Sequence, residues 1–106
     1  MTLRVVVVTY NSAGVVARCL KSCRDLAVTV VDNFSSDGTG LRVKELRLPN
    51  VRLIENTENR GFAAAVNQAV AEAPEDVILL LNPDVELLSS VDPLVEAIDV
   101  KGCGIA

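Results

Sequence analysis

The residues best suited to chemistry include Asn82-Pro83-Asp84, which directly follow the apolar run 77–81. That run is short and entirely aliphatic, as expected of a strand buried on both faces. Pro83 fixes its own φ and pushes Asn82 toward extended geometry, so Asp84 is held in a definite direction. A carboxylate at this point can bind Mg²⁺ or Mn²⁺ together with a diphosphate, although Asn-Pro-Asp is also an ordinary turn sequence.

A second acid, Asp32, closes the apolar run 27–31. In a dinucleotide-binding domain such an acid holds a ribose, but that fold needs Gly-x-Gly-x-x-Gly after its first strand, and residues 9–14 contain a single glycine. A carboxylate or an Asn side chain can instead accept a hydrogen bond from the imide N–H of uracil or thymine. Capping of the following turn is the structural alternative for Asp32.

A third polar segment, Asn59-Arg60-Gly61, precedes a helical pattern that begins at Phe62. Free N–H groups and the dipole of a helix N-terminus favour an anion, and Gly61 permits close backbone approach. Asn59 and Arg60 add donors. In the alternative interpretation Gly61 eases a tight turn, and Asn67 either braces this loop or is exposed.

The elements that must position these residues alternate along the chain. We expect strands at 3–8, 27–31, 51–55 and 77–81, and helices at 13–23, from a cap within 35–38 to about 48, at 62–73 and at 92–100. This order predicts an α/β fold with an open, doubly wound, mostly parallel sheet. The polar and glycine-containing loops all follow strands, so they gather at the carboxyl edge, where such sheets bind ligands.

Helical spacing also predicts the buried face of two helices. The first face comprises Val15, Val16, Cys19, Leu20 and Cys23, and the second comprises Phe62, Ala65, Val66, Ala69, Val70 and Ala73.

Composition limits the function. The 106 residues fit one domain, and 50% hydrophobic with only 3% aromatic residues indicates an aliphatic core. A net charge of −4 argues against nucleic-acid or anionic-membrane binding, and the absence of histidine excludes Ser–His and Cys–His nucleophile pairs. We interpret Cys19 and Cys23 as small buried hydrophobes in a reducing compartment, in preference to zinc or redox ligands.

No apolar run approaches the ~20 residues of a membrane span. We therefore expect a cytoplasmic protein, with peripheral association at the inner face of the membrane left open.

Four ordered motifs, residues 5–11, 31–39, 59–63 with Asn67, and 81–84, together resemble the N-terminal half of a family 2 glycosyltransferase with the GT-A, Rossmann-like fold. The Asn-Pro-Asp variant and the Gly-Phe helix start are similar to the rhamnosyltransferase-like branch. The resemblance implies a UDP-, dTDP- or GDP-sugar donor, a divalent metal, and inverting transfer to a hydroxyl of a saccharide or other acceptor.

Carried over by motif, the resemblance implies these roles: Thr9, Tyr10 and Asn11 line the nucleoside pocket, Asp32 reads the base beside Asn33, Asn59-Arg60-Gly61 borders the nucleotide, and Asn82 and Asp84 form the metal corner with Asp84 as ligand. Asn82 replaces the first acid of the usual Asp-x-Asp motif, so we expect weak metal binding without donor. Ala65 stands where related sequences often have glycine.

In this family the acceptor site and the catalytic base come later in the chain. We therefore expect residues 1–106 to be a single donor-binding domain, truncated from a longer enzyme and inactive alone, with self-association through exposed faces. Glu86 and Asp92 are weak candidates for the base. The alternative is a non-catalytic nucleotide- or protein-binding module; a phospho-acceptor domain is disfavoured because no acidic pair follows the first strand.

Overall fold

The computed structural model describes residues 2–86. The elements in this part of the chain are β1 (Leu3–Thr9), α1 (Val16–Ser22), β2 (Ala27–Asp32), α2 (Thr39–Glu45), β3 (Val51–Glu55), α3 (Phe62–Glu72) and β4 (Val77–Leu81). The predicted alternation of strands and helices is confirmed for these elements. The helix predicted at 92–100 lies outside the described residues.

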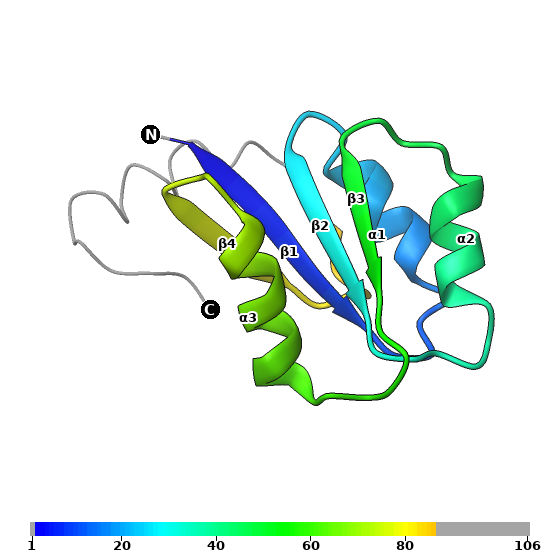
Figure 1. The fold of residues 1–106 in the computed structure, drawn as a ribbon. Helices are drawn as coiled ribbons and strands as arrows, with labels where there is room; N and C mark the ends of the chain where they lie inside the picture. Colours follow the sequence, from blue (N-terminus) through cyan, green and yellow to red (C-terminus); the bar gives the residue numbers. More distant parts are fainter. Residues whose placement is uncertain (1, 87–106) are drawn as a thin grey trace.

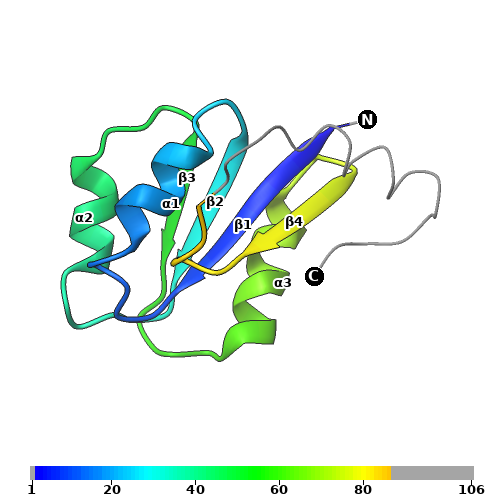
Figure 2. The ribbon, with the colours of Figure 1, turned by 180° about the vertical axis from the view of Figure 1, so that it is seen from behind.

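The four strands form one parallel sheet in the order β3-β2-β1-β4. Helices α1 and α2 cover one face and α3 covers the other, which confirms the doubly wound arrangement (Figures 1 and 2). All four strands point the same way, so their carboxyl ends meet at the lower edge of the sheet in Figure 1.

Alternating residues of the strands divide the core in two. Val5, Val7, Val28 and Val30 pack with α1 and α2, whereas Val6 and Val31 pack with α3. Both sets are β-branched and fully buried, as in a sheet covered on both faces. The two inner strands, β1 and β2, therefore contribute side chains to the core on both faces of the sheet.

Helix α1 is shorter than predicted. The chain turns at residues 12–15, where the N–H groups of Val15 and Val16 both donate to the carbonyl of Ser12. Val15 consequently precedes the helix and is 42% exposed, so its predicted place in the core is wrong. The rest of the predicted face is confirmed as buried: Val16, Cys19, Leu20 and Cys23.

Cys19 of α1 and Cys23, its C-cap residue, are free and buried, as predicted. A hydrogen bond to Cys23, together with burial, raises the pKa of the Cys19 thiol. Both cysteines belong to the hydrophobic core of residues 2–86, which fits a role in packing.

Helix α2 is also shorter than predicted and ends at Glu45. Gly38, with φ +86°, occupies its N-cap position without a side-chain cap. At the other end Leu46 and Arg47 donate to carbonyls three residues back, and Arg47 has φ +50°, so the helix stops before Leu48.

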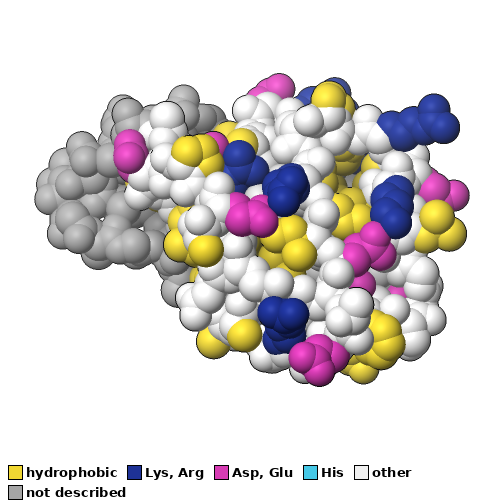
Figure 3. All heavy atoms as spheres, in the orientation of Figure 1, with side chains coloured by type: hydrophobic (Ala, Val, Ile, Leu, Met, Phe, Trp, Pro, Cys, Tyr) yellow, Lys and Arg dark blue, Asp and Glu magenta, His cyan; other side chains and the backbone are white. Residues whose placement is uncertain are grey.

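Helix α3 contacts the sheet through a narrower face than its spacing predicts. Only Ala65 and Ala69 are buried, whereas Phe62 is 57% and Val70 42% exposed. Two small residues one turn apart let the helix lie close to the sheet, which leaves its larger side chains at the sides. Figure 3 shows hydrophobic side chains on this face interspersed with charged ones, and self-association stays a prediction.

The opposite, amino edge of the sheet is closed by polar contacts. Arg4 forms a bidentate ion pair with Glu75 at 2.7 and 3.1 Å, which lowers the pKa of that glutamate. The Asn50 side chain donates to the carbonyls of Cys23 and Leu26.

Across residues 2–86, no helix is both long and apolar enough to cross a bilayer.

Candidate functional site

The buried carboxylate of Asp32 lies at the carboxyl edge, where its strand position is opposite Thr9. It is 4% exposed and accepts hydrogen bonds from the Thr9 hydroxyl at 2.6 Å, the Ser35 hydroxyl at 2.6 Å and the Ser35 N–H at 3.1 Å. This geometry supports the turn-capping interpretation. Because Oδ2 accepts only the Ser35 N–H among these contacts and a carboxylate oxygen has two acceptor sites, Asp32 retains capacity for a ligand donor.

The loop after β1 is attached to the loop after β2 through Asn11. The Asn11 N–H donates to the Ser35 hydroxyl at 2.7 Å, and its side-chain oxygen accepts from the Ser36 N–H at 2.8 Å. Asn11 has φ +51°, a conformation that asparagine tolerates better than most residues. Its side chain therefore holds the loop, while Tyr10 beside it is 54% exposed.

Asp37 continues this attachment toward α2. It accepts from the Ala13 N–H at 3.1 Å and from both the N–H and the hydroxyl of Thr39, and the hydrogen bond from that hydroxyl is the main cause that lowers the Asp37 pKa. The Thr39 hydroxyl oxygen in turn accepts the buried Ser12 N–H at 2.9 Å. Three successive N–H groups, at 11, 12 and 13, thus donate to side chains of the segment 35–39, which ends at the first residue of α2.

Asn33 links the loop after β2 to the loop after β3. It is 3% exposed; its amide nitrogen donates to the Gly61 carbonyl at 3.0 Å, and its oxygen accepts from Asn56 at 2.9 Å and from the Arg60 N–H at 3.4 Å. The Asn33 side chain thus links two loops by hydrogen bonds. Asn33 lies at the predicted edge of the sheet, but these bonds leave its side chain little capacity to bind a ligand.

Sequence reasoning missed Asn56. It is buried, contacts Asn33, and forms a reciprocal amide pair with Gln68 of α3 at 2.8 and 2.9 Å. The available signal was its position directly after β3, corresponding to Asn33 after β2. Its pairing with Gln68 depends on how α3 packs on the sheet, which the sequence pattern does not contain.

The turn at Asn59-Arg60-Gly61 differs from one expectation. The Gly61 N–H donates to the Asn59 side chain at 2.9 Å, so it is not free for an anion as predicted. Gly61 has φ +84° and ψ 167°, a region that almost only glycine occupies. The glycine is therefore required by the backbone, and α3 begins without a side-chain cap directly after it.

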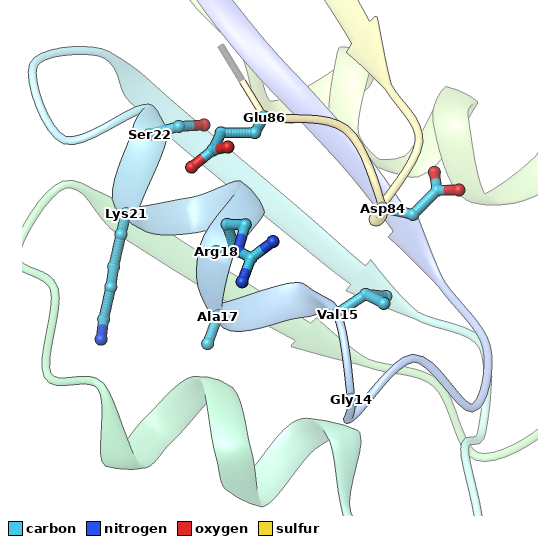
Figure 4. Close-up of a pocket in the computed structure, with 8 residues that line it drawn as sticks. All are labelled: Gly14, Val15, Ala17, Arg18, Lys21, Ser22, Asp84 and Glu86. Carbon is cyan, nitrogen blue, oxygen red and sulfur yellow. The ribbon is translucent and has the colours of Figure 1, made fainter. Parts of the chain in front are cut away.

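The loop after β4 has a different character. The Val85 N–H donates to the Asn82 carbonyl at 3.0 Å and closes a turn around Pro83, and the Cys19 thiol lies 3.7 Å from the same carbonyl. Asn82 and Asp84 are exposed. In Figure 4 the Asp84 carboxylate points away from α1.

A cavity of about 610 Å³ lies between this loop and α1. Its lining is mixed in charge and consists of Gly14, Val15, Ala17, Arg18, Lys21, Ser22, Asp84 and Glu86 (Figure 4).

Residues 2–86 contain no group of three acidic, cysteine or histidine side chains that could hold a metal unaided. Asp84 and Asn82 nevertheless offer exposed oxygen ligands two residues apart. Mg²⁺ and related ions commonly take one or two carboxylates and complete their shell with phosphate and water. The residues present therefore fit a cation that arrives with, or is completed by, a diphosphate.

Comparison with known proteins decides the family. Residues 4–106 match the family model described as glycosyl transferase family 2. The chain belongs to this family. The N-acetylglucosaminyl-diphospho-decaprenol L-rhamnosyltransferase of Mycobacterium tuberculosis is 35% identical over an alignment of 112 positions, and the alignment covers 90% of this chain and 36% of that protein. The succinoglycan biosynthesis protein ExoO of Rhizobium meliloti is 33% identical, covering 95% and 31%.

Solved structures agree with this assignment. S. aureus TarS 1-349 superposes with a TM-score of 0.80 at 25% identity, covering 94% of this chain and 33% of that one. The mannosyltransferase PcManGT of Pyrobaculum calidifontis, in complex with GDP-Man and Mn²⁺, gives 0.77 at 31% identity, covering 91% and 31%. These matches confirm the predicted GT-A fold, and this family 2 chain spans about a third of the length of its relatives.

Within this family 2 chain, the structure joins three of the predicted segments directly by hydrogen bonds: Thr9 to Asn11, Asp32 with Asn33, and Asn59 to Gly61. The fourth, Asn82 to Asp84, follows a strand paired with β1 and reaches the same edge. Their roles toward a ligand stay predictions.

Proposed function

We propose that residues 1–106 form the donor-binding domain of a glycosyltransferase. The reaction is transfer of a sugar from a nucleoside diphosphate to an acceptor hydroxyl with inversion at the sugar. The observation that supports it best is the buried Asp32, held by Thr9 and Ser35 at the same edge as the exposed Asp84. One carboxylate is fixed for directional hydrogen bonding, and the other is accessible to a cation.

In this proposal the free acceptor site of Asp32 receives the imide or amide N–H of the base. Thr9 holds the carboxylate in place from β1, and Asn11 fixes the loop that carries Tyr10 along the nucleoside. These side chains bind and orient the nucleoside without moving a proton.

The diphosphate lies between the turn at Asn59 to Gly61 and Asp84. A divalent cation, Mg²⁺ or Mn²⁺, would be held by Asp84 with Asn82 beside it, and it would neutralise the charge that develops on the departing diphosphate. Asn82 is neutral, so the protein contributes a single negative charge in this loop up to residue 84. We infer that the cation binds far better with the donor than without it.

The acceptor is a saccharide or another hydroxyl compound. The M. tuberculosis relative takes its name from rhamnosyl transfer to a polyprenyl-diphosphate-linked sugar, and that class is the first to examine here. We place the base that deprotonates the acceptor in the part of the relatives' length that this chain does not cover, since they are about three times as long.

Calorimetric titration with UDP-, dTDP- and GDP-sugars, with and without Mn²⁺, tests the proposal. We expect one donor class to bind in a Mn²⁺-dependent manner, and Asp84→Ala to remove the dependence on metal. Asp25→Ala is the matched control, because Asp25 is also exposed but lies on the opposite, amino edge between α1 and β2.

Binding that ignores metal and nucleotide would contradict the proposal. It would favour a non-catalytic α/β module that uses the same fold to bind a protein partner.

A further inference from the structure

The aromatic residues of this chain are all outside its core. The sequence contains one tyrosine, two phenylalanines and no tryptophan. Tyr10 is 54%, Phe34 60% and Phe62 57% exposed, while the core consists of aliphatic residues and cysteines. Aromatic side chains normally contribute large buried areas to a protein core. The exclusion of all three from this core indicates that they contact a ligand or another molecule.

The three aromatic residues also share one location. The Asn33 N–H donates to the Thr9 carbonyl at 2.9 Å, and the Asn33 side chain donates to the Gly61 carbonyl at 3.0 Å. Each of these three linked residues is followed directly by one of the aromatic residues. The backbone segments that carry the three aromatic residues are therefore linked through the buried Asn33 at the carboxyl edge.

Phe34 is the most unusual of the three because its backbone has φ +66°. A bulky residue in this left-handed region is strained, and glycine or asparagine is normally found there. The conformation is imposed from both sides: Asn33 is bound to Thr9, and Ser35 donates both its N–H and its hydroxyl to Asp32. Strain and exposure of a phenyl ring are both unfavourable in the free protein.

We propose that Phe34 is a stacking surface for the nucleobase, and that it adds affinity while Asp32 provides the directional hydrogen bond. This inference rests on the proposed function. The hydrogen bonds between Asp32 and Ser35 fix the segment that carries Phe34. Phe34 is two positions along the chain from Asp32, whose carboxylate would face the edge of the base. Every base has a π-face, so stacking on Phe34 would strengthen binding of different nucleotides alike.

The test compares Phe34→Asn, Phe34→Trp and the control Val70→Asn. Asparagine tolerates positive φ, so Phe34→Asn keeps the backbone without the ring; Val70 is an exposed apolar residue in the second half of α3. Each protein is titrated with the nucleoside diphosphate that the wild type binds tightest and, separately, with pyrophosphate, both with Mn²⁺.

We expect Phe34→Asn to weaken nucleotide binding about 5- to 150-fold, the range of aromatic–base stacking, with pyrophosphate binding unchanged and a thermal midpoint no lower than that of the wild type. Phe34→Trp should keep the affinity, and Val70→Asn should leave it unaltered.

Equal nucleotide affinity of Phe34→Asn and wild type would overturn the inference and leave the proposed function standing. A Phe34→Asn variant that loses only a concentration-dependent dimer would also overturn it, because the ring would then serve contact between copies. A wild-type protein that binds no nucleotide would contradict the inference and the proposed function together.

Discussion

The loops after β1, β2 and β3 differ sharply from the loop after β4, although all four lie at one edge of the sheet. The first three are joined by side chains that are themselves buried, among them Asp32, Asn33 and Asn56. The loop after β4 keeps Asn82 and Asp84 exposed, and its turn closes through its own backbone.

This difference separates two ways of building a ligand site. In the first three loops the polar groups are oriented before any ligand arrives, so little order is lost on binding. After β4 the exposed carboxylate of Asp84 is solvated until a cation and a diphosphate replace the solvent. Substitutions of the buried polar side chains should therefore cost folding stability in the first region, whereas substitutions of Asp84 should cost ligand affinity alone in the second.

The largest expected effect is that of Asp32→Ala. Removing this carboxylate leaves the hydroxyl of Thr9, which is fully buried, and the hydroxyl and N–H of Ser35 without their acceptor. An unsatisfied buried donor costs about 1–3 kcal/mol, so we expect a loss of about 3 kcal/mol or more in the free energy of unfolding. Urea denaturation measures it.

Asp25→Ala, on the opposite edge, should change stability by less than about 0.5 kcal/mol. An Asp32→Ala protein as stable as this control would mean that the loops after β1 and β2 are not organised by the buried carboxylate.

A smaller effect is expected for Asn33→Ala, at about 2 kcal/mol, because its partners are the Gly61 carbonyl, the Arg60 N–H and the Asn56 amide, the last of which keeps Gln68. Hydrogen exchange should locate the change at residues 59–61. Protection there that matches the wild type would contradict the assignment of Asn33 as the link between these loops.

The sequence predicts the strands and the edge at which the loops gather better than it predicts the contacts among side chains. The strand bounds 51–55 and 77–81 agree with prediction. Residues 77–81 are a continuous aliphatic run between Asp76 and Asn82, and Val51 and Leu53 alternate with Arg52 between Asn50 and Asn56. The gathering of polar loops at one edge follows from parallel strand order alone. The strand bounds follow from local sequence, and the gathering of the loops follows from the order of the elements, so a single sequence is enough to predict both.

What the sequence does not predict depends on tertiary contact. Helical spacing placed Phe62 and Val70 in the core, but the sheet accepts only the row of Ala65 and Ala69. The pairing of Asn56 with Gln68 needs α3 to be placed first. The hydrogen bond from the Gly61 N–H to the Asn59 side chain is local, but the motif alone does not predict it.

A still smaller, pH-dependent effect is expected for Asp37→Asn. Hydrogen bonds, first from the Thr39 hydroxyl, lower the pKa of Asp37 in the folded state. Its contribution to stability is therefore present above the ordinary aspartate pKa of about 3.9 and is lost as the pH falls through the lower, folded-state value. Urea midpoints of wild type and Asp37→Asn should differ at pH 7 and converge as the pH falls below the folded-state pKa of Asp37.

The acidic groups of the ion pairs Arg4–Glu75 and Arg52–Glu72 titrate in both proteins, so they cancel in this difference. A difference between wild type and variant that stays constant with pH would show that the Asp37 charge does not stabilise the attachment of the two loops.

The smallest effect on folding is expected for Asp84→Asn, and it tests the second half of the comparison. The carboxylate is exposed, so its replacement should change the free energy of unfolding by less than about 0.5 kcal/mol without ligand. With saturating donor and Mn²⁺ the wild type should gain stability in proportion to RT ln(1 + [L]/Kd), and the variant should lose most of that gain. Equal gains in both proteins would place the cation elsewhere. A variant destabilised without ligand would mean that the loop after β4 is built into the fold like the other three.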